Sequence, residues 1–411
     1  MGNLLVQKMG HLLTIRKRRG SNVPLCKIRA PDLTKDSPEM KVPFLKPSIE
    51  EEDIERMNAS IRSGWLTYGP YTREFERKLA AFANMPHVVM TASCTASLHI
   101  SLMLANVGRG DEVITTPLSW VATANVILYQ GAKVVFAEVD PKTGNLDPVD
   151  VERRITHRTK AIIVVHLYGV MADMKSFEAL SKKYGLAIIE DAAHAIESSR
   201  DGLRPGHVGL SACYSFHVAK NITAAQGGAI ALHDEGHEQA VRMFRRHGVR
   251  NTEDGKRRML SLGYKYEGSD LQAALLLGQL ARIDSTHQAR LRIFTRYLEA
   301  FRTCPGIRFP EVPHGAGHSG HMFIVWVDPA KRDTIRAGLA RNGIETSIHF
   351  DAIHLEPYYR NEFGYSDGDF PVAERLGRAT ISLPTYPSLT DQEQQHVIDS
   401  LCRLVKGKDD R

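Results

Sequence analysis

The chain has 411 residues, of which 43% are hydrophobic and 24% charged, a composition typical of globular proteins with a sizeable core. No apolar run approaches the ~20 residues that cross a bilayer, so we expect no membrane span. The net charge of +6 is concentrated in residues 1–31, which hold seven basic residues and no acidic one. The remainder is therefore close to neutral, and we expect no nucleic-acid partner for it.

Residues 1–40 are predicted to be a flexible basic extension. Their charge follows a mildly apolar start, the reverse of a secretory signal, and they hold little of the Ser expected of a transit peptide. The chain length then favours a large domain over residues 41–285 and a smaller one over residues 286–411. The cysteines are scattered without metal-ligand spacing, which indicates a reducing, cytoplasmic compartment and no metal site; they are Cys26, Cys94, Cys213, Cys304 and Cys402.

The globular part is predicted to begin with helices. Ser48 and the acidic residues after it indicate a helix start, and this helix should run to Ser63. Residues 65–70, which include Thr67, form a loop dense in turn residues and aromatics that lies either at an interface or in a pocket. The apolar spacing of residues 75–82 predicts a second helix.

A candidate anion site follows a short predicted strand at residues 87–91. The small residues 93–97 lead from this strand into a predicted helix at residues 98–104. That arrangement points backbone N–H groups and a helix N-terminus at an anion, and the Thr95 hydroxyl could add a donor. Taken alone, these residues are better explained as a plain N-cap.

Strands and helices then alternate along the chain. Strands are predicted at residues 113–116, 133–139, 161–165 and 186–189, and helices at residues 121–129 and 177–184. This alternation predicts a parallel sheet covered on both faces, with ligands beyond the carboxyl ends of its strands. Trp120 and Asp191 both follow such ends, and Asp191 could be a helix cap or the partner of a buried cation.

Lys220 lies between a Ser/His-bearing segment and a Gly-Gly turn, before the apolar run 229–232. Residues 236–300 are predicted to be strongly helical, with an interruption at residues 263–268. A strand at residues 322–327, a helix at residues 333–342 and a final amphipathic helix to about Val405 predict a smaller α+β domain.

These fragments together supply what pyridoxal phosphate requires. Its phosphate needs a helix N-terminus and hydroxyls, which Thr95 and Ser215 can provide. Trp120 offers an aromatic face to its ring. Asp191 would keep the ring nitrogen protonated, and Lys220 could form an imine with the aldehyde. Each fragment has a simpler explanation, but their joint occurrence on an α/β pattern predicts a cofactor site.

From Val42 to Val405 the chain resembles the StrS/DegT-type nucleotide-sugar aminotransferases. The segments that carry the resemblance are residues 63–70, 93–99, 110–117, 120–125, 189–195 and 215–220. It implies the fold-type I architecture of pyridoxal phosphate enzymes, an α/β fold with a mostly parallel central sheet covered by helices and a smaller C-terminal α+β domain.

The resemblance also implies a role for individual residues. Lys220 matches the Schiff-base lysine, Asp191 the acid on the ring nitrogen, and His194 the residue beside the cofactor's phenolic oxygen. The remaining expected contacts are Thr95, Ala96 and Ser215 to the phosphate, with Cys94 in the same cradle, Trp120 stacked on the ring, and Thr67 and His349 at the sugar. The family is dimeric, and each site borrows residues from the neighbouring subunit.

Two segments depart from the family pattern. Members usually read Gly-Glu-Gly-Gly where this chain has Ala-Gln-Gly-Gly at residues 225–228. They usually carry Tyr-Asn-Tyr-Arg at the position of Tyr264–Glu267, a segment that contributes to the neighbour's phosphate site. Lys265 could replace positive charge there, whereas Glu267 would repel a phosphate if it pointed at one.

The implied reaction moves an amino group from L-glutamate to a keto sugar. The sugar would be a nucleotide-linked 4-keto or 3-keto deoxysugar, used for cell-surface polysaccharide or a secondary metabolite. Deoxysugar dehydratases of the same fold carry histidine in place of the lysine, so Lys220 disfavours them. A non-catalytic cofactor-binding regulatory protein and an aminotransferase acting on a cyclitol ketone (inosose) stay open.

Overall fold

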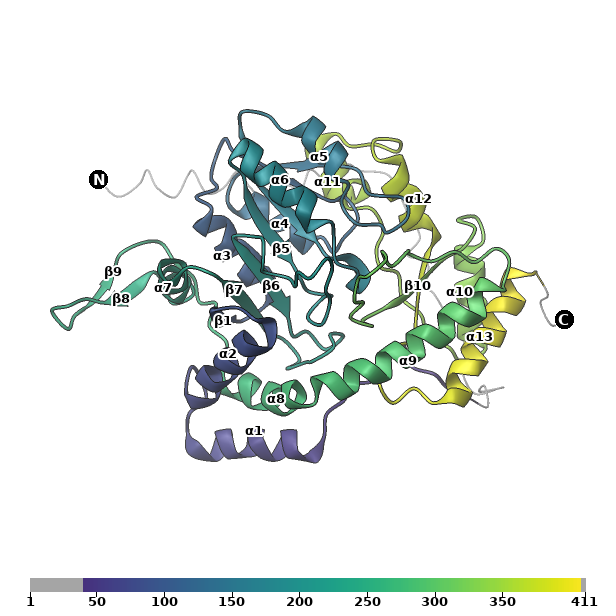
Figure 1. Cartoon of the computed structure of the whole chain (residues 1–411), viewed down its shortest axis with the longest axis horizontal. Helices are drawn as coiled ribbons and strands as arrows, with labels where there is room; N and C mark the ends of the chain where they lie inside the picture. The colour runs from purple at the N-terminus through teal and green to yellow at the C-terminus, as the bar shows by residue number, and fades with distance from the viewer. Residues whose placement is uncertain (1–39, 408–411) are drawn as a thin grey trace, which may run out of the picture. The chain divides into compact units, whose positions relative to one another are not determined.

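The computed structural model describes residues 40–407, so the predicted basic extension falls, apart from its last residue, outside the described part. A seven-stranded sheet in the order β1-β7-β6-β5-β4-β2-β3 forms the centre (Figure 1). Its strand β7 is antiparallel to both neighbours and the remaining pairs are parallel, which confirms a mostly parallel sheet. The strands are β1 (His87–Thr91), β2 (Glu112–Thr115), β3 (Lys133–Phe136), β4 (Thr159–Val165), β5 (Ala187–Asp191), β6 (Ser211–Ser215) and β7 (Gly228–Leu232).

Helices cover both faces of this sheet. Val113 and Ile163 share a core with α3 and α4, while Ile114 and Ile162 share a core with α5 and α6. Successive strand residues thus enter opposite cores, as expected for strands buried on both sides. These helices and the pair α2 and α8, which packs on β1, β6 and β7, are α2 (Pro70–Ala83), α3 (Cys94–Leu104), α4 (Ala122–Tyr129), α5 (Pro148–Arg154), α6 (Met174–Tyr184) and α8 (Asp270–Ala281).

The first helix, α1 (Glu51–Ser63), begins later than the predicted start at Ser48. Glu50 is its N-cap, and the Glu50 N–H donates to the Asp53 carboxylate at 3.0 Å. The carbonyl of Ser48 instead accepts a hydrogen bond of 2.9 Å from Arg282. A long-range contact therefore holds Ser48 outside the helix, and an acidic residue takes the capping role.

The stretch 236–300 is less helical than predicted, and this prediction is corrected. Between α7 (Glu235–Phe244) and α8 lies an antiparallel hairpin, β8 (Val249–Asn251) and β9 (Arg257–Met259), and α9 (Ile283–Arg302) follows α8. The hairpin extends away from the sheet in Figure 1, and its strands are largely exposed. Exposed strands have no buried face, so they leave no alternating pattern in the sequence.

The C-terminal residues form a second, smaller sheet of β10 (Phe323–Trp326) and β11 (Thr380–Leu383), which are antiparallel. Three helices, α9, α10 (Arg332–Arg341) and α13 (Asp391–Val405), share a core with it. The short helices η1 (Leu167–Gly169), η2 (Ile353–Leu355), α11 (Pro357–Phe363) and α12 (Pro371–Ala379) complete the set. The described residues belong to one compact unit, so the domain boundary at residue 285 remains a prediction.

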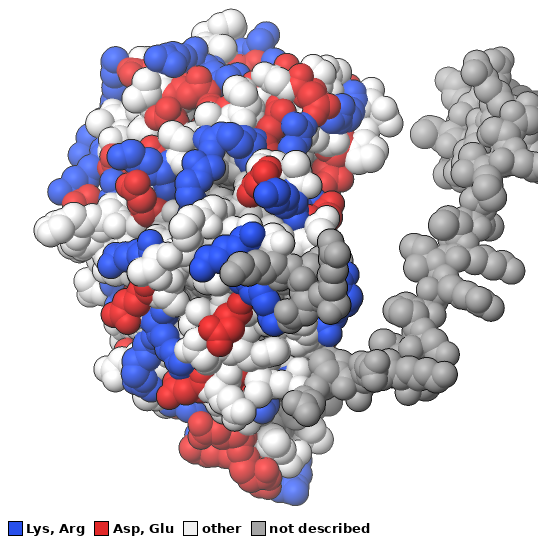
Figure 2. Space-filling model, turned by 90° about the vertical axis from the view of Figure 1, so that its right-hand side faces the viewer, with Lys and Arg blue, Asp and Glu red and all other residues white. Residues whose placement is uncertain are grey.

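The surface on the side of α10 and α13 carries acidic and basic side chains interspersed (Figure 2). Among residues 40–407, no helix is long and apolar enough to cross a membrane. The same residues contain no group of three or more His, Cys, Asp or Glu side chains placed to hold a metal ion. The cysteines within this range are all free thiols.

Candidate active site

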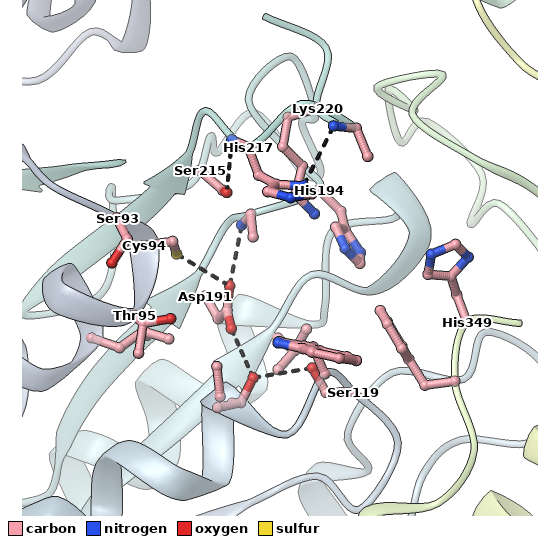
Figure 3. A pocket seen from close by; sticks show the side chains of 18 of the residues that line it. Ser93, Cys94, Thr95, Ser119, Asp191, His194, Ser215, His217, Lys220 and His349 are labelled. Carbon is pink, nitrogen blue, oxygen red and sulfur yellow. Dashed lines mark hydrogen bonds between the residues drawn. The ribbon is translucent and has the colours of Figure 1, made fainter. Parts of the chain in front are cut away.

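A cavity of about 420 Å³ lies beyond the carboxyl ends of β4, β5 and β6, the edge predicted from the strand pattern. Figure 3 shows how side chains from separate elements surround it. Eight of the predicted site residues line it: Cys94, Thr95, Trp120, Asp191, His194, Ser215, Lys220 and His349. Ala96 does not line the cavity, and its N–H donates to Ser93 Oγ at 3.1 Å.

Lys220 lies on the loop that joins β6 to β7. The loop is held by its own backbone: Val218 N–H donates to the Ala225 carbonyl at 3.1 Å, and Lys220 N–H donates to the His217 carbonyl at 2.9 Å. Ala225 has φ +61°, in the left-handed region. A residue with a Cβ is strained there, so glycine would suit this position better than alanine does.

The variant Ala225→Gly is therefore expected to be more stable than the wild type by about 0.5–1 kcal/mol, because glycine relieves the strain at positive φ. Urea unfolding of the purified protein measures the difference. Ala224→Gly is the matched control, since Ala224 is buried and does not have positive φ, and it should lower stability. A stability loss in Ala225→Gly comparable to that control would contradict the assigned backbone conformation.

The Lys220 amine has a pKa lowered to about 8, because burial disfavours its charged form. The negative charge of Asp191 acts in the opposite direction, Cys94 would do so only if it were ionised, and burial is the larger effect. At neutral pH a larger fraction of this amine is thus neutral and nucleophilic than of a lysine with the ordinary pKa of 10.5.

In protein freed of cofactor, the rate of covalent attachment of pyridoxal phosphate to Lys220 should rise to half its maximum near pH 8, because only the neutral amine reacts. Competitive acylation followed by mass spectrometry of peptides measures this titration directly. The exposed Lys160 serves as an internal reference on the same molecule. Half-maximal reaction of Lys220 near the ordinary value of 10.5 would contradict the assignment.

Asp191 is the last residue of β5 and is 5% exposed. It accepts hydrogen bonds from Thr123 Oγ1 at 2.9 Å and from the Ala193 N–H at 3.2 Å, and Cys94 Sγ lies 3.9 Å away. Burial raises its pKa, although these donors and Lys220 oppose the shift. Asp191 forms no ion pair within residues 40–407. It is therefore a buried acid that lacks a cationic partner, which a positively charged ligand group would supply.

His194 follows Asp191 on the same segment and is also buried. Its Nδ1 accepts the Tyr168 N–H at 3.3 Å, so the neutral ring carries its proton on Nε2. Burial first, and then the positive charge of Lys220, lowers its pKa well below the usual value. The ring therefore stays neutral and can donate one hydrogen bond from Nε2.

The first turn of α3 forms a cradle. Ser93 is its N-cap, and the N–H groups of Cys94 and Thr95 lie at the helix start, where they have no acceptor within the helix. A Cβ at Gly228 would overlap the backbone of Ser93 and Cys94, so the absence of a side chain lets β7 pass directly under this turn. Ser215 pairs with Gly228 across the ladder, which brings its hydroxyl to the same place.

Trp120 and His349 flank the cavity mouth. Trp120 is 62% exposed, and its ring lies 6.3 Å from that of Phe350. His349 Nδ1 is hydrogen-bonded to Ser382 Oγ at 2.7 Å, and burial, with help from the charge of Lys220, lowers its pKa to about 4. Stacking of Trp120 on a ring and sugar contact by His349 remain predictions.

Thr67 and Lys265 lie outside the cavity wall formed by this chain. Thr67 is exposed and its carbonyl accepts the Asp270 N–H at 2.7 Å. Lys265 is exposed and is paired with Glu267, whose carboxylate also lies 4.0 Å from Arg246. The charge of Glu267 is thus partly compensated within the same chain.

Other residues on the cavity wall were not singled out as site residues from the sequence, among them Ser119, Thr123 and Phe350. Thr123 supports Asp191, and its own hydroxyl lies 3.1 Å from that of Ser119. The i, i+4 spacing of Ser119 and Thr123 directly after a strand was the available signal. Phe350 had none, because its neighbour His194, with stacked rings 5.9 Å apart, is distant in the sequence.

Pyridoxal phosphate fits these residues. The buried acid Asp191 without a cationic partner suits a protonated ring nitrogen, the α3 cradle suits a phosphate, and the partly neutral Lys220 suits the aldehyde. The fold and the site are those of a pyridoxal phosphate-dependent aminotransferase.

The chain belongs to the DegT/DnrJ/EryC1/StrS aminotransferase family, which it matches over residues 47–402. It is 38% identical over 381 residues to the spore coat polysaccharide biosynthesis protein SpsC of Bacillus subtilis, covering 90% of this chain and 98% of SpsC. It is therefore a sugar aminotransferase of this family.

Solved structures agree with this assignment. The PMP form of the sugar aminotransferase Spr1654 from Streptococcus pneumoniae superposes with a TM-score of 0.85 at 29% identity, over 90% of this chain and 98% of that chain, and its PLP form superposes with the same TM-score at 28% identity. PseC from Helicobacter pylori, an aminotransferase involved in pseudoaminic acid biosynthesis, superposes with a TM-score of 0.85 at 28% identity, over 90% of this chain and 100% of that chain.

Proposed function

We propose that this enzyme transfers the amino group of L-glutamate to a keto sugar linked to a nucleoside diphosphate, a 4-keto or 3-keto deoxysugar, in polysaccharide biosynthesis. The observation that carries the proposal is the convergence of Lys220, His194 and Asp191 on one cavity. The likeness to a spore coat polysaccharide biosynthesis protein over 90% of the chain favours a polysaccharide precursor.

When bound, pyridoxal phosphate supplies an electron sink and carries the amino group between the two substrates. Asp191 would hold the proton on the ring nitrogen, and His194 would donate its Nε2–H to the phenolic oxygen. Lys220 Nζ takes the proton from Cα of glutamate. In the second half-reaction it delivers a proton to the sugar carbon that receives the amino group. Over a full cycle, the proton removed from glutamate is thus balanced by the proton given to the sugar.

The test is a half-reaction followed by a substrate panel. Holoenzyme mixed with L-glutamate should release 2-oxoglutarate, and subsequent addition of nucleotide-linked 4-keto or 3-keto sugars should return the enzyme to its starting absorbance. Holoenzyme that retains cofactor but releases no 2-oxoglutarate would instead be a non-catalytic regulatory protein. Turnover with inosose and with no nucleotide sugar would identify a cyclitol aminotransferase.

We further propose that the active unit is a homodimer in which Thr67 and Lys265 serve the partner's site. Both are exposed and lie off the cavity of their own chain, which supports this role. If so, mixed dimers of the inactive variants Lys220→Ala and Lys265→Ala should recover part of the activity, because one of their two sites is intact. No recovery in dimers shown by mass to be mixed would contradict sharing.

A further inference from the structure

Asn221 directly follows Lys220, and both polar atoms of its side chain form hydrogen bonds to buried groups. Its Nδ2 donates to Glu197 Oε2 at 2.7 Å and to the Ser319 carbonyl at 3.0 Å. Asn221 is 8% exposed, so these bonds are made away from water. The lysine loop is thereby attached to two segments that are distant in the sequence.

Two more groups complete the attachment. His321 Nδ1 lies 3.0 Å from Asn221 Oδ1, and because an amide oxygen only accepts, His321 is the donor and is protonated on Nδ1. Arg290, buried on α9, donates from Nη2 to the backbone carbonyl of Asn221 at 2.9 Å. Asn221 thus has partners for both side-chain polar atoms and for its carbonyl.

The same C-terminal segment also holds His194. Ser319 Oγ donates to the His194 carbonyl at 2.7 Å, and the rings of His194 and His321 are 4.8 Å apart. Residues 319–321 therefore contact both the loop that carries Lys220 and the segment that carries His194. The relative position of these two groups depends on one short stretch of chain.

Glu197 is a buried acidic member of this network. It is 8% exposed, its Oε1 has no hydrogen-bond partner, and within residues 40–407 it forms no ion pair. Burial raises its pKa to about 7, against the charge of Arg290. A buried carboxylate held through one oxygen costs free energy, and the contact it makes is the one to Asn221.

We propose that Asn221 is a positioning residue for Lys220. Glu197 fixes the orientation of the Asn221 side chain, and this orientation holds the Lys220 amine in its position relative to His194. This inference rests on the proposed role of Lys220. Proton transfer needs the amine over the reacting carbon, and a displacement of about 1 Å can cost on the order of 10²-fold in rate. A lysine stem is flexible, so the backbone beneath it must supply that precision.

The experiment compares holoenzyme of the variants Asn221→Ala, Glu197→Ala and Glu197→Gln. The amide oxygen introduced by Glu197→Gln can still accept from Asn221, so this variant should retain most of the activity. Glu197→Ala and Asn221→Ala should each lose on the order of 10²-fold in kcat. KM for glutamate should change little. The pH titration of the visible absorbance of the bound cofactor, which reports its bond to Lys220, should shift in both alanine variants and stay near wild type in Glu197→Gln.

The matched control is Gln394→Ala. Gln394 is another buried amide, which donates to the Ile293 carbonyl at 2.7 Å in the C-terminal core, away from the cavity. It should lower Tm without changing kcat or the titration. If Asn221→Ala and Glu197→Ala behave like this control, or if Glu197→Gln loses as much as Glu197→Ala, the positioning role is wrong.

Borohydride reduction with peptide mapping separates this failure from failure of the proposed function. Label on a residue other than Lys220 would overturn the assigned site itself. Label on Lys220, together with variants that change only Tm, would overturn the positioning role alone. If Asn221→Ala does not fold, the comparison of Glu197→Ala with Glu197→Gln still tests the positioning role.

Discussion

Lys220→Ala is expected to lower kcat by about 10⁴-fold, because it removes both the amine that bonds to the cofactor and the group that moves the proton. The visible absorbance that arises from the cofactor bound to Lys220 should disappear, while added cofactor can still be retained in the cavity. Single-turnover reaction with L-glutamate, followed by release of 2-oxoglutarate, measures the loss.

The matched control is Lys183→Ala on α6, where the amine is exposed and paired with Glu152 at 2.7 Å. It should leave both kcat and the absorbance unchanged. Activity of Lys220→Ala within tenfold of wild type would remove Lys220 from the mechanism, and with it the proposed function.

Asp191→Asn is expected to lower kcat by about 10-fold to 10³-fold. A carboxylate near the ring nitrogen raises the pKa of that nitrogen by about 1–3 units, and each unit corresponds to about tenfold in rate if the protonated ring is required. The neutral amide is nearly isosteric and can still accept the hydrogen bond from Thr123. Rapid mixing with L-glutamate should show slow proton removal with retained glutamate binding.

The same substitution should have the opposite effect on the protein without cofactor. Burial raises the pKa of Asp191 above 3.8, so its contribution to stability is present below that value and is lost as the pH rises through the raised pKa. At neutral pH the cofactor-free Asp191→Asn protein should therefore melt at a higher temperature than wild type. The difference should shrink as the pH is lowered toward 3.8.

Glu190→Gln is the control for both measurements. Glu190 is the preceding strand residue, so it points to the other face of the sheet, where it binds His166 Nε2 at 2.9 Å and lies off the cavity. It should affect stability but not the reaction with glutamate. Equal kinetic losses in both variants would show that the charge of Asp191 has no specific role.

Most of the sheet could be predicted because its strands are short apolar runs with turn residues between them, but β6 (Ser211–Ser215) was not predicted. The strand predicted at residues 87–91 coincides with β1 (His87–Thr91), and the alternation with helices gave the parallel pairing. The reversed direction of β7 could not be read from its apolar sequence, since an apolar run carries no direction. The hairpin β8–β9 was missed for the opposite reason, because its exposed polar strands have no buried face.

The chemistry of the site was also predictable, but its support was not. Lys220 and Asp191 were identified because chemically distinctive groups follow the ends of predicted elements, whereas His194 was identified only through the family resemblance. The contacts that tune them come from distant elements, as when Ser319 binds the His194 carbonyl across 125 positions of sequence. Only the folded chain brings such partners together.

The reversal of β7 governs how the reactive lysine behaves on heating. Ser215 and Gly228 are paired in the adjacent antiparallel strands β6 and β7. Both ends of the loop between them are therefore held by the same ladder of hydrogen bonds within the central sheet. We therefore expect Lys220 to move far from the cavity only when that ladder separates. On heating, the loss of visible absorbance from the bound cofactor and the unfolding of the domain should accordingly occur at the same temperature. No folded intermediate that lacks this absorbance should appear at lower temperature.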